Sequence, residues 1–413
     1  MDSGVTTQEL MHFRHDATPL PLPTEDAADD AEKITQWLLE CAFFKPFVYR
    51  NPKKDPKKEF ADALILFHDT IVIVQVKAKS SERLEVEWLP KHATKASKQL
   101  NGSFRQLKDG IVKDFINPVF SVKKEIDLSK YLYVYGIIIL DGVSEIIDPL
   151  PLIDLGNKPL IPSVFMSTSD LKILIERVNT AADFINYCEA HSKLATQEPV
   201  PINQEFETLL RISADVPYLL SEGKSIETLD KGYKKGFAWI SRLFNGEVNR
   251  DPNYRFGLLV DDIISHLQDL DPQYSGPMNE SSLNSLRIAE QLGWLDRKRR
   301  IELGKLLHKF ATAAYDGNFR ILPYMRPTLG ILFIFLFSKE NRNERRELLE
   351  MFVGLAQVKY KITRVLGIAT EPIGNGRSYD LILVEKMIFK PDVIVPEELL
   401  ATLPDLTKPL VKD

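Results

Sequence analysis

Cysteine is scarce in this sequence: its 413 residues include only Cys41 and Cys188. Two cysteines exclude a disulfide scaffold and a cysteine-rich zinc site, and such low usage is typical of a reducing cytoplasm. Spaced His and Cys ligands, a phosphate-binding glycine loop and a serine–histidine triad are also missing. We therefore expect a cytoplasmic protein whose chemistry uses other residue types.

Long hydrophobic runs are missing as well. The longest, LGILFIFLF at residues 329–337, is far shorter than the roughly 20 residues that span a bilayer, and it is typical of a buried strand. The acidic N-terminal region lacks the apolar core of a secretion signal. We expect no membrane partner.

The chain has no strong excess of one charge, since 53 Lys and Arg oppose 58 Asp and Glu. A net charge of −5 argues against a protein that coats nucleic acid over its whole surface. The distribution is uneven, however: residues 45–114 hold fifteen bases and nine acids, a local charge of +6. This segment suits phosphate binding, and a solvated lysine-rich surface is the alternative.

The length predicts two or three domains. We expect a flexible tail over 1–24, an α/β domain over 25–195, a linker at 196–204, a mainly helical domain over 205–320 and a small α/β C-terminal domain over 321–413. Two helices of the helical domain are expected to join near Gly293. The basic cluster DRKRRIELGK at 296–305 is expected to be a solvated turn between helices, with partner or substrate recognition as the alternative. The predicted elements of the first domain are listed in chain order: a helix capped by Asp29 or Asp30, a strand at 47–51, a hairpin within 59–79, a helix at 91–108, a strand at 131–142 and a helix at about 170–191. This order predicts a mixed sheet flanked by helices.

The hairpin, EFADALILFHDTIVIVQVKAK at residues 59–79, carries polar residues inside apolar runs. If its strands turn symmetrically about His68 and Asp69, the numbers of paired residues sum to 137 and Asp62 lies opposite Gln75. Lys77 then projects on the same face, because side chains alternate along a strand. The three polar groups should converge.

Such a cluster can hold Mg²⁺, or Mn²⁺, which prefers oxygen ligands. Asp62 offers a carboxylate, Gln75 an amide carbonyl and Val76 a backbone carbonyl. Lys77 can lower the pKa of an attacking water or stabilise charge growing on a phosphate. The alternative is a solvated ion pair at the ends of two strands.

The hairpin resembles the core motif of the PD-(D/E)XK nuclease superfamily, an acid on one strand followed by acid–any–lysine on the next. Asp62 matches the first acid and Lys77 the lysine. Gln75 departs from the usual acid, but Gln–any–Lys is the form of the Mrr-like branch of restriction endonucleases. The resemblance covers about residues 25–190 and implies a restriction-endonuclease-like fold with a metal-dependent nuclease site.

The resemblance also implies roles outside the hairpin. Members of this superfamily often carry a further glutamate on the first helix, for which Glu32 is the candidate and Glu40 a weaker one. The helix after the hairpin lies beside the active site in this fold, where Lys95, Lys98 and Gln99 are candidates to bind nucleic acid. The alternatives are an acid favoured by the helix dipole and residues that face water.

Two functions follow from these observations. The first is a Mg²⁺-dependent endonuclease acting on nucleic acid, with DNA as the expected substrate and restriction or phage defence as its setting. The second is a catalytically degenerate nuclease fold that binds nucleic acid or serves as a scaffold, because Gln75 removes one negative charge from the site. Many nucleases of this kind act as homodimers, although no seam for a dimer is visible in the sequence.

Overall fold

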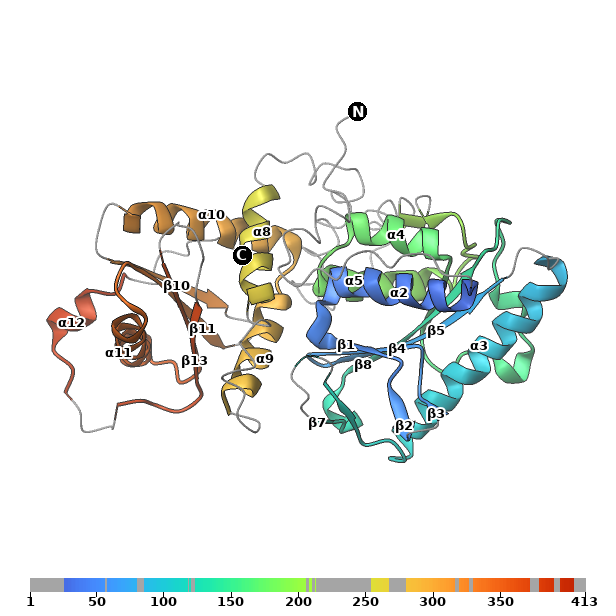
Figure 1. Cartoon of the computed structure of the whole chain (residues 1–413), viewed down its shortest axis with the longest axis horizontal. Helices are drawn as coiled ribbons and strands as arrows, with labels where there is room; N and C mark the ends of the chain where they lie inside the picture. The colour runs from blue at the N-terminus through green and yellow to red at the C-terminus, as the bar shows by residue number, and fades with distance from the viewer. Residues whose placement is uncertain are drawn as a thin grey trace, which may run out of the picture. The chain divides into compact units, whose positions relative to one another are not determined.

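The structure is a computed structural model of the chain (Figure 1). It describes residues 26–55, 58–79, 85–117, 119, 123–205, 208–209, 212, 254–266, 280–315, 319–326, 330–371, 379–389 and 394–404. The expected flexible tail at 1–24 lies outside these residues. The chain divides into two compact units, Met1–Tyr254 with Gly293–Arg297, and Arg255–Leu292 with Lys298–Asp413.

The first unit is built on a mixed five-stranded sheet, as expected for an α/β fold. Its strands, in spatial order, are β1 (Val48–Arg50), β4 (Ala63–Phe67), β5 (Thr70–Ala78), β8 (Tyr133–Asp141) and β9 (Ser163–Met166). The pairs β1–β4 and β4–β5 are antiparallel, whereas β5–β8 and β8–β9 are parallel. Strand β9 was not predicted.

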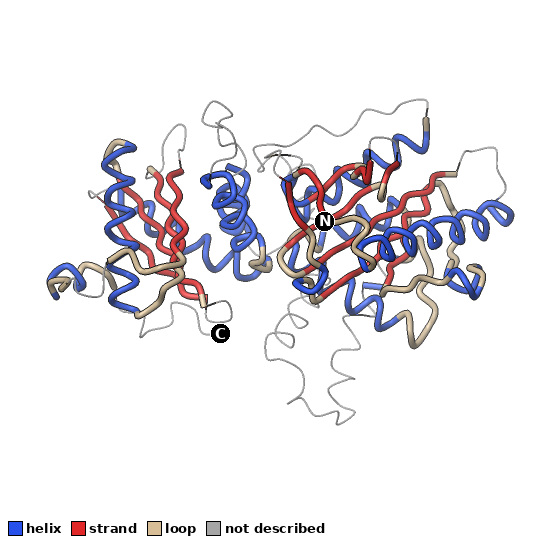
Figure 2. Tube along the Cα trace, turned by 90° about the horizontal axis from the view of Figure 1, so that it is seen from below, coloured by secondary structure: helices blue, strands red, loops and turns tan. Residues whose placement is uncertain are grey.

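Helices cover both faces of this sheet. They are α2 (Ala27–Phe43), α3 (Glu85–Lys108), α4 (Thr168–Arg177) and α5 (Ala181–Leu194). Figures 1 and 2 show α3 on one face and the other three helices on the opposite face. The described residues of the unit also form four short 3₁₀ helices: η1 (Lys45–Phe47), η2 (Leu128–Lys130), η3 (Leu150–Leu152) and η4 (Leu155–Asn157). There are also two small hairpins: β2 (Lys53–Asp55) with β3 (Lys58–Glu59), and β6 (Asp114–Ile116) with β7 (Lys123–Glu125).

Helix α3 packs on the sheet through the apolar stripe that its sequence predicts. Ala93, Ala96 and Leu100 are fully buried in the core between helix and sheet. Leu100 lies directly over Gly136 of β8, where an added Cβ would stand 2.5 Å from the leucine side chain. The glycine therefore allows a close approach of α3 to β8, since an added Cβ would force the Leu100 side chain to move.

The start of α2 differs from the prediction. Asp26, rather than Asp29 or Asp30, caps the helix, because its carboxylate accepts hydrogen bonds from the backbone N–H groups of Ala28 and Asp29. Asp29 lies in the first turn, where it pairs with Lys33. The correction moves the helix start toward the N-terminus and keeps Glu32 within its first two turns.

The helix expected at about 170–191 is two helices, so that prediction was wrong. The break falls between α4 and α5, where the hydroxyl of Thr180 accepts a hydrogen bond from the Asp183 backbone N–H and caps a new helix. A threonine cap interrupts a periodic apolar pattern without changing its period, which explains why the pattern concealed the break. The linker expected at 196–204 is also part of the unit, since Ile202 is buried and bridges to Ile147.

The second unit contains a four-stranded mixed sheet and several helices. The strands, in spatial order, are β10 (Phe319–Arg326), β11 (Ile331–Ser338), β12 (Val365–Thr370) and β13 (Tyr379–Val384). The helices are α8 (Tyr254–His266), α9 (Glu280–Gly293), α10 (Arg297–Tyr315), α11 (Arg342–Tyr360) and α12 (Glu397–Ala401). The joint between α9 and α10 falls at Gly293, as predicted. The predicted boundary at residue 320 lies inside this unit, which holds both α10 and the sheet.

The basic cluster at 296–305 was expected to be a solvated turn, and that expectation was wrong. Arg297 and Arg300 are both fully buried. Arg300 pairs with Asp261 of α8, whereas the Nε of Arg297 donates to the side-chain oxygen of Asn179 at 2.9 Å. Paired, buried arginines indicate a structural role. Among the described helices, none combines the length and apolar character needed to cross a membrane.

Candidate active site

The β4–β5 hairpin has the register that its sequence predicts. The ladder runs from Ala63 opposite Val74 to Phe67 opposite Thr70, so paired numbers sum to 137 throughout. The turn at 68–69 contains His68 with a φ of 52°, a left-handed conformation that suits a two-residue hairpin turn. The ladder ends at Ala63 and Val74, and the predicted pairing of Asp62 with Gln75 is not part of it, because the Asp62 backbone N–H donates to the Val74 carbonyl.

Asp62 closes the end of this ladder. Its backbone N–H donates to the Val74 carbonyl at 3.2 Å, and its side chain is largely buried, with 8% of the residue exposed. The carboxylate Oδ2 accepts a hydrogen bond of 2.6 Å from the backbone N–H of Val76. The acid therefore points at strand β5, where the two predicted ligand residues lie.

Lys77 meets this carboxylate. Its Nζ lies 3.4 Å from Oδ2 of Asp62, and it also donates to the backbone carbonyl of Val76 at 2.5 Å. The ammonium thus lies between two oxygens that were both predicted to bind a cation. The structure brings Asp62, Val76 and Lys77 together, in a place where only 13% of the lysine side chain is exposed.

Gln75 is the most deeply buried member of the cluster, with 2% exposed. Its side-chain Oε1 has no hydrogen-bond partner among the described residues. A buried acceptor left without a partner costs about 1–3 kcal/mol, and eleven other buried side-chain atoms of the described residues share this state, so it does not by itself mark a ligand site. The unsatisfied oxygen is what a neutral cation ligand would look like before the cation binds.

Glu32 joins the cluster from helix α2. The pKa of its carboxyl is raised from 4.5 to about 7, first because burial disfavours the charged form and second because the Asp62 carboxylate repels it. The Lys77 ammonium opposes this rise. The weaker candidate, Glu40, is instead held by Arg50 through two bonds of 2.6 and 2.7 Å, so it is structural.

Two residues that the sequence did not predict hold the backbone of Asp62. Gln36, with 4% exposed, donates through Nε2 to the Asp62 carbonyl at 2.7 Å and to the side-chain oxygen of Asn51 at 2.6 Å. The Asn51 backbone N–H donates to the same carbonyl at 3.1 Å, with Asn51 in a left-handed conformation. Gln36 follows Glu32 by four residues, and this spacing was the available signal that both share one face of α2.

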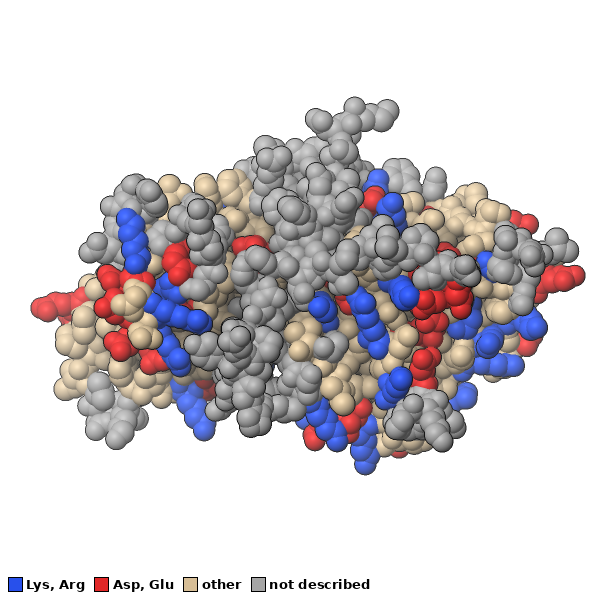
Figure 3. Space-filling model, viewed as in Figure 1, with Lys and Arg blue, Asp and Glu red and all other residues tan. Residues whose placement is uncertain are grey.

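Lys95, Lys98 and Gln99 are exposed on α3. The helix is tied to the segment leading into the site, because the hydroxyl of Ser103 donates to the carbonyl of Phe60, two residues before Asp62, at 2.5 Å. Figure 3 shows acidic side chains gathered near the start of α2 and basic side chains beside them, over α3. The three predicted nucleic-acid-binding residues thus lie on a helix next to the site.

The donor set is consistent with a hard divalent cation. Within the described part of the chain, no group of three or more His, Cys, Asp or Glu side chains is arranged to hold a metal. Here the oxygens come from one carboxylate, Asp62, with the amide of Gln75 and the carbonyl of Val76, and Glu32 nearby. Oxygen donors with few charges suit Mg²⁺, which keeps several of its waters.

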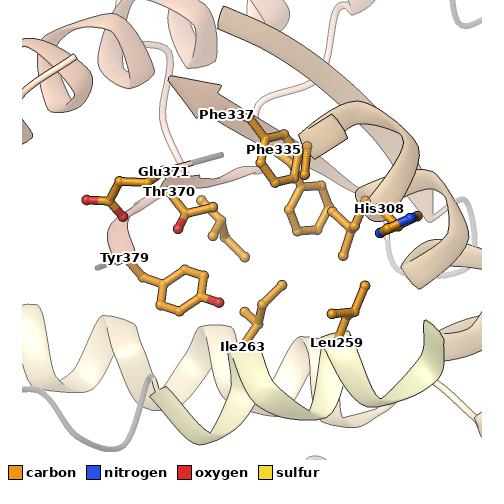
Figure 4. A pocket seen from close by; sticks show the side chains of 11 residues that line it. Leu259, Ile263, His308, Phe335, Phe337, Thr370, Glu371 and Tyr379 are labelled. Atoms are coloured by element: carbon orange, nitrogen blue, oxygen red, sulfur yellow. The ribbon is translucent and has the colours of Figure 1, made fainter. Parts of the chain in front are cut away.

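A second concave feature lies in the second unit, between α8, α10 and the sheet (Figure 4). Its walls are mostly apolar, including Leu259, Ile263 and Phe335, and Glu371 at its edge is paired with Arg345. The cavity has a volume of about 40 Å³, which is room for about three water molecules. A nucleotide would not fit in it, so we place no reaction there.

Compared with known proteins, the chain matches no family model, no curated protein and no solved structure.

Proposed function

We propose that the chain is a metal-dependent nuclease that hydrolyses phosphodiester bonds in nucleic acid, with DNA as the expected substrate. The observation that carries the proposal is the convergence of Asp62, the Val76 carbonyl and Lys77. Gln75, two residues before Lys77 on the same strand, adds a buried oxygen without a partner among the described residues. The resemblance of the hairpin to the PD-(D/E)XK motif, in its Gln–any–Lys form, supports the same activity. Restriction or phage defence is the setting that the resemblance suggests.

Asp62, Gln75 and Val76 would hold Mg²⁺ or Mn²⁺ through a carboxylate, an amide and a backbone oxygen. When bound, the ion would lower the pKa of water and stabilise negative charge on the phosphate. Gln75 contributes no charge, so the site depends on the carboxylate of Asp62 for its attraction to the cation. Asp62 is held for this task by Gln36 and Val76.

Lys77 supplies a positive charge at the reacting phosphate. Its ammonium is anchored beside Asp62 and is partly exposed, so one of its three N–H groups can point at a phosphate oxygen. A donor aimed at developing charge in a partly dry site is worth about 10²–10³-fold in rate. The same ammonium pairs directly with the Asp62 carboxylate, 3.4 Å away.

Glu32 is suited to accept a proton from the attacking water. A general base works best when its pKa is near the operating pH, and the pKa of Glu32 is about 7. The carboxyl is only half buried, so water can reach it. Burial next to Asp62 thus turns an ordinary first-helix acid into a base matched to neutral pH.

The test is metal-dependent cleavage by the purified chain. Linear, circular and single-stranded DNA, and RNA, are incubated with and without Mg²⁺ or Mn²⁺, beside the Asp62→Ala and Lys77→Ala variants. We expect cleavage that requires metal and is lost in both variants. Cleavage that survives in both would show that the reaction occurs elsewhere.

A catalytically degenerate fold is the second candidate, and Gln75 is the observation that favours it. With an amide in place of an acid, the site offers one fewer negative charge to a metal. That function predicts nucleic-acid binding that falls steeply with salt, with no cleavage under any metal condition. The Gln75→Glu variant separates the two candidates further. Its added charge should strengthen metal binding in either case. Cleavage that appears in the variant but is absent from the wild type would show that the natural site is degenerate.

A further inference from the structure

Helix α3 carries more positive charge than the three predicted residues. Between Trp88 and Lys108 it has five Lys or Arg residues and no Asp or Glu. Four of them, with a glycine, recur at alternating spacings of four and three residues: Lys91, Lys95, Lys98, Gly102 and Arg105. That spacing places all five on one strip of the helix surface, opposite the buried stripe. We call these residues the α3 basic strip.

Within the described part of the chain, the charges of the strip have no acidic partners. All four cations are exposed, and among the described residues none has a carboxylate within salt-bridge distance. Elsewhere in the same unit, exposed lysines such as Lys123 and Lys193 do pair with acids. An acid-free row of unpaired cations is stable only because water and counterions surround it, and a polyanion can replace those counterions.

The α3 basic strip has no side chain at its centre, where Gly102 lies. Among the described residues, no atom lies within 4 Å of the place where a Cβ would stand on Gly102. Glycine costs helix stability of about 1 kcal/mol relative to alanine, yet nothing in the described packing here requires it. Its effect is to leave open space between Lys98 and Arg105, where a nucleic-acid backbone could lie close to the helix.

The dimensions suit a regular duplex. From Lys91 to Arg105 the helix rises about 21 Å, at roughly 1.5 Å per residue. A duplex places one phosphate of each strand about every 3.4 Å, so the strip spans about six base-pair steps. Single-strand binders add exposed aromatic platforms for stacking, whereas the strip consists only of cations and glycine, and Trp88 of the same helix is buried.

We propose that the α3 basic strip is the track along which the sugar–phosphate backbone of double-stranded DNA binds. The inference rests on the proposed function, because α3 lies beside the candidate active site and Ser103 ties it to the segment before Asp62. Gln99 lies on the flank between the strip and Ser103, so it contacts the part of the backbone nearest the site. Contacts of this kind position a duplex without reading its sequence.

The first test measures duplex binding by the full chain in EDTA, so that metal-dependent cutting does not interfere. Lys91, Lys95, Lys98 and Arg105 are changed together to Gln, which keeps helix propensity. Fluorescence anisotropy with a duplex is recorded over a series of salt concentrations. We expect the slope of log affinity against log salt to fall by about 0.9 for each phosphate that the variant no longer neutralises, up to about 3.6 for four. Affinity should weaken equally for duplexes of unrelated sequence.

The matched control is Lys108→Gln, on the same helix but off the strip and equally exposed. It should change the slope by much less than one unit. A quadruple variant with an unchanged slope, or a Lys108→Gln effect as large as that of a strip residue, would overturn the proposal. Circular dichroism and unfolding of each variant check that α3 still folds.

A second test uses the open position at Gly102. Gly102→Glu and Gly102→Gln have nearly the same shape and differ in charge, and both fit the open space. We expect Gly102→Glu to weaken duplex binding, most at low salt, and Gly102→Gln to weaken it far less. Equal effects from the two variants would show that the strip does not meet a phosphate backbone.

Competitors identify the partner. Single-stranded DNA, duplex RNA, heparin and vesicles of anionic lipid are compared in the same assay. A strip-dependent preference for duplex DNA supports the proposal, whereas equal strip-dependent binding of heparin or vesicles, or tighter binding of RNA, overturns it. If the strip binds duplex DNA but no metal condition gives cleavage, the proposed nuclease activity is wrong and the proposed DNA-binding role of the α3 basic strip still holds. If the chain cuts and the strip variants cut with unchanged KM, the track fails and the nuclease remains.

Discussion

Each of the two units has a place where a carboxylate meets a cation at a buried strand, and the two places differ in how well their polar groups are satisfied. In the second unit, Arg345 of α11 is fully buried, its Nε donates to Asp380 at 2.7 Å and its Nη1 lies 2.6 Å from Glu371. In the first unit, Lys77 is 3.4 Å from Asp62, and Gln75 next to it keeps an unpartnered oxygen among the described residues. We call Arg345 with its two acids the arginine cluster, and Asp62, Gln75 and Lys77 the hairpin cluster.

The difference separates a structural cluster from a chemical one. The arginine cluster uses the planar fork of Arg345 to pair with two acids at once, so each acid has a charged partner. The hairpin cluster leaves an amide oxygen unsatisfied and raises the pKa of Glu32 to about 7. Strongly shifted pKa values are found most often at sites that bind a ligand or carry out a reaction. Removing one member should therefore damage stability in one cluster and activity in the other.

The largest expected effect is on stability, from Arg345→Met. The change leaves Asp380 buried with the exposed Arg342, at 2.9 Å, as its remaining charged partner among the described residues. Breaking a buried pair in this way typically costs 3–5 kcal/mol, and we expect about 3 kcal/mol because Arg342 remains. Urea unfolding measures the loss. The control is Arg346→Met, an exposed arginine paired with Glu350, which should cost about 0.5 kcal/mol or less.

In the same variant, cleavage per folded molecule should be unchanged. A fall in cleavage as large as the fall in stability would mean that the two clusters are not separable in function.

Lys77→Met should give the opposite pattern. Without the ammonium, cleavage should fall about 10²–10³-fold, because a donor at the reacting phosphate is missing. The free energy of unfolding should change by about 1 kcal/mol or less, since Asp62 keeps its bond from the Val76 N–H. Single-turnover cleavage and urea unfolding are compared in one preparation. Lys172→Met, an exposed lysine on α4, should alter neither. Unchanged cleavage with lower stability would place Lys77 in the structural class.

The features of the two clusters that could be predicted from the sequence are those set by residues close together in the chain. The hairpin register followed from local rules, because a two-residue turn and alternating apolar residues admit one pairing that buries both strands. The convergence of Asp62 and Lys77 followed from that register. The buried stripe of α3 was predictable for the same reason, since it reflects a helical period.

The rest depends on contacts between segments far apart in the chain. Glu32 and Glu40 look equivalent on α2, and only the position of Arg50 makes Glu40 structural. The burial of Gln75 depends on how α3 docks, and the burial of Arg297 depends on Asn179, which lies 118 residues away. Caps such as Asp26 and Thr180 depend on a single side chain, so apolar periodicity does not reveal them.

Gln36 offers an intermediate case between the two clusters, because it is fully satisfied yet holds a residue of the active site. Gln36→Ala removes the bonds to the Asp62 carbonyl and to Asn51, and we expect about 1–3 kcal/mol lower stability. Loosening a residue that orients a metal ligand typically costs 10–100-fold in metal affinity or activity. Mn²⁺ binding, followed by electron paramagnetic resonance, should weaken by about tenfold, and kcat should fall with little change in KM.

A purely structural role for Gln36 would lower stability and leave Mn²⁺ affinity unchanged. Gln106→Ala on α3, which removes a side-chain bond to the Gly102 carbonyl, serves as the control for losing a half-buried amide elsewhere. It should leave both Mn²⁺ affinity and kcat as they are.

Glu32 tests the pH dependence of the hairpin cluster. Because the pKa of this carboxyl is raised from 4.5 to about 7 on folding, the folded chain holds its proton more tightly than the unfolded chain does. The wild type should therefore lose stability relative to Glu32→Gln as pH rises from about 4.5 to 7, and the difference should stay constant above 7. Unfolding in EDTA at a series of pH values measures this, and a difference that is constant across the window would show that Glu32 titrates normally.

Below pH 7 the base form of Glu32 increases about tenfold for each pH unit, so wild-type cleavage should rise through this range and level off. Glu32→Gln should cut more slowly and without this rise, whereas Glu87→Gln, an exposed acid at the start of α3, should keep the wild-type profile. A rise in cleavage with pH that persists in Glu32→Gln would show that another group is the base. Glu32 would then have a structural role, like the members of the arginine cluster.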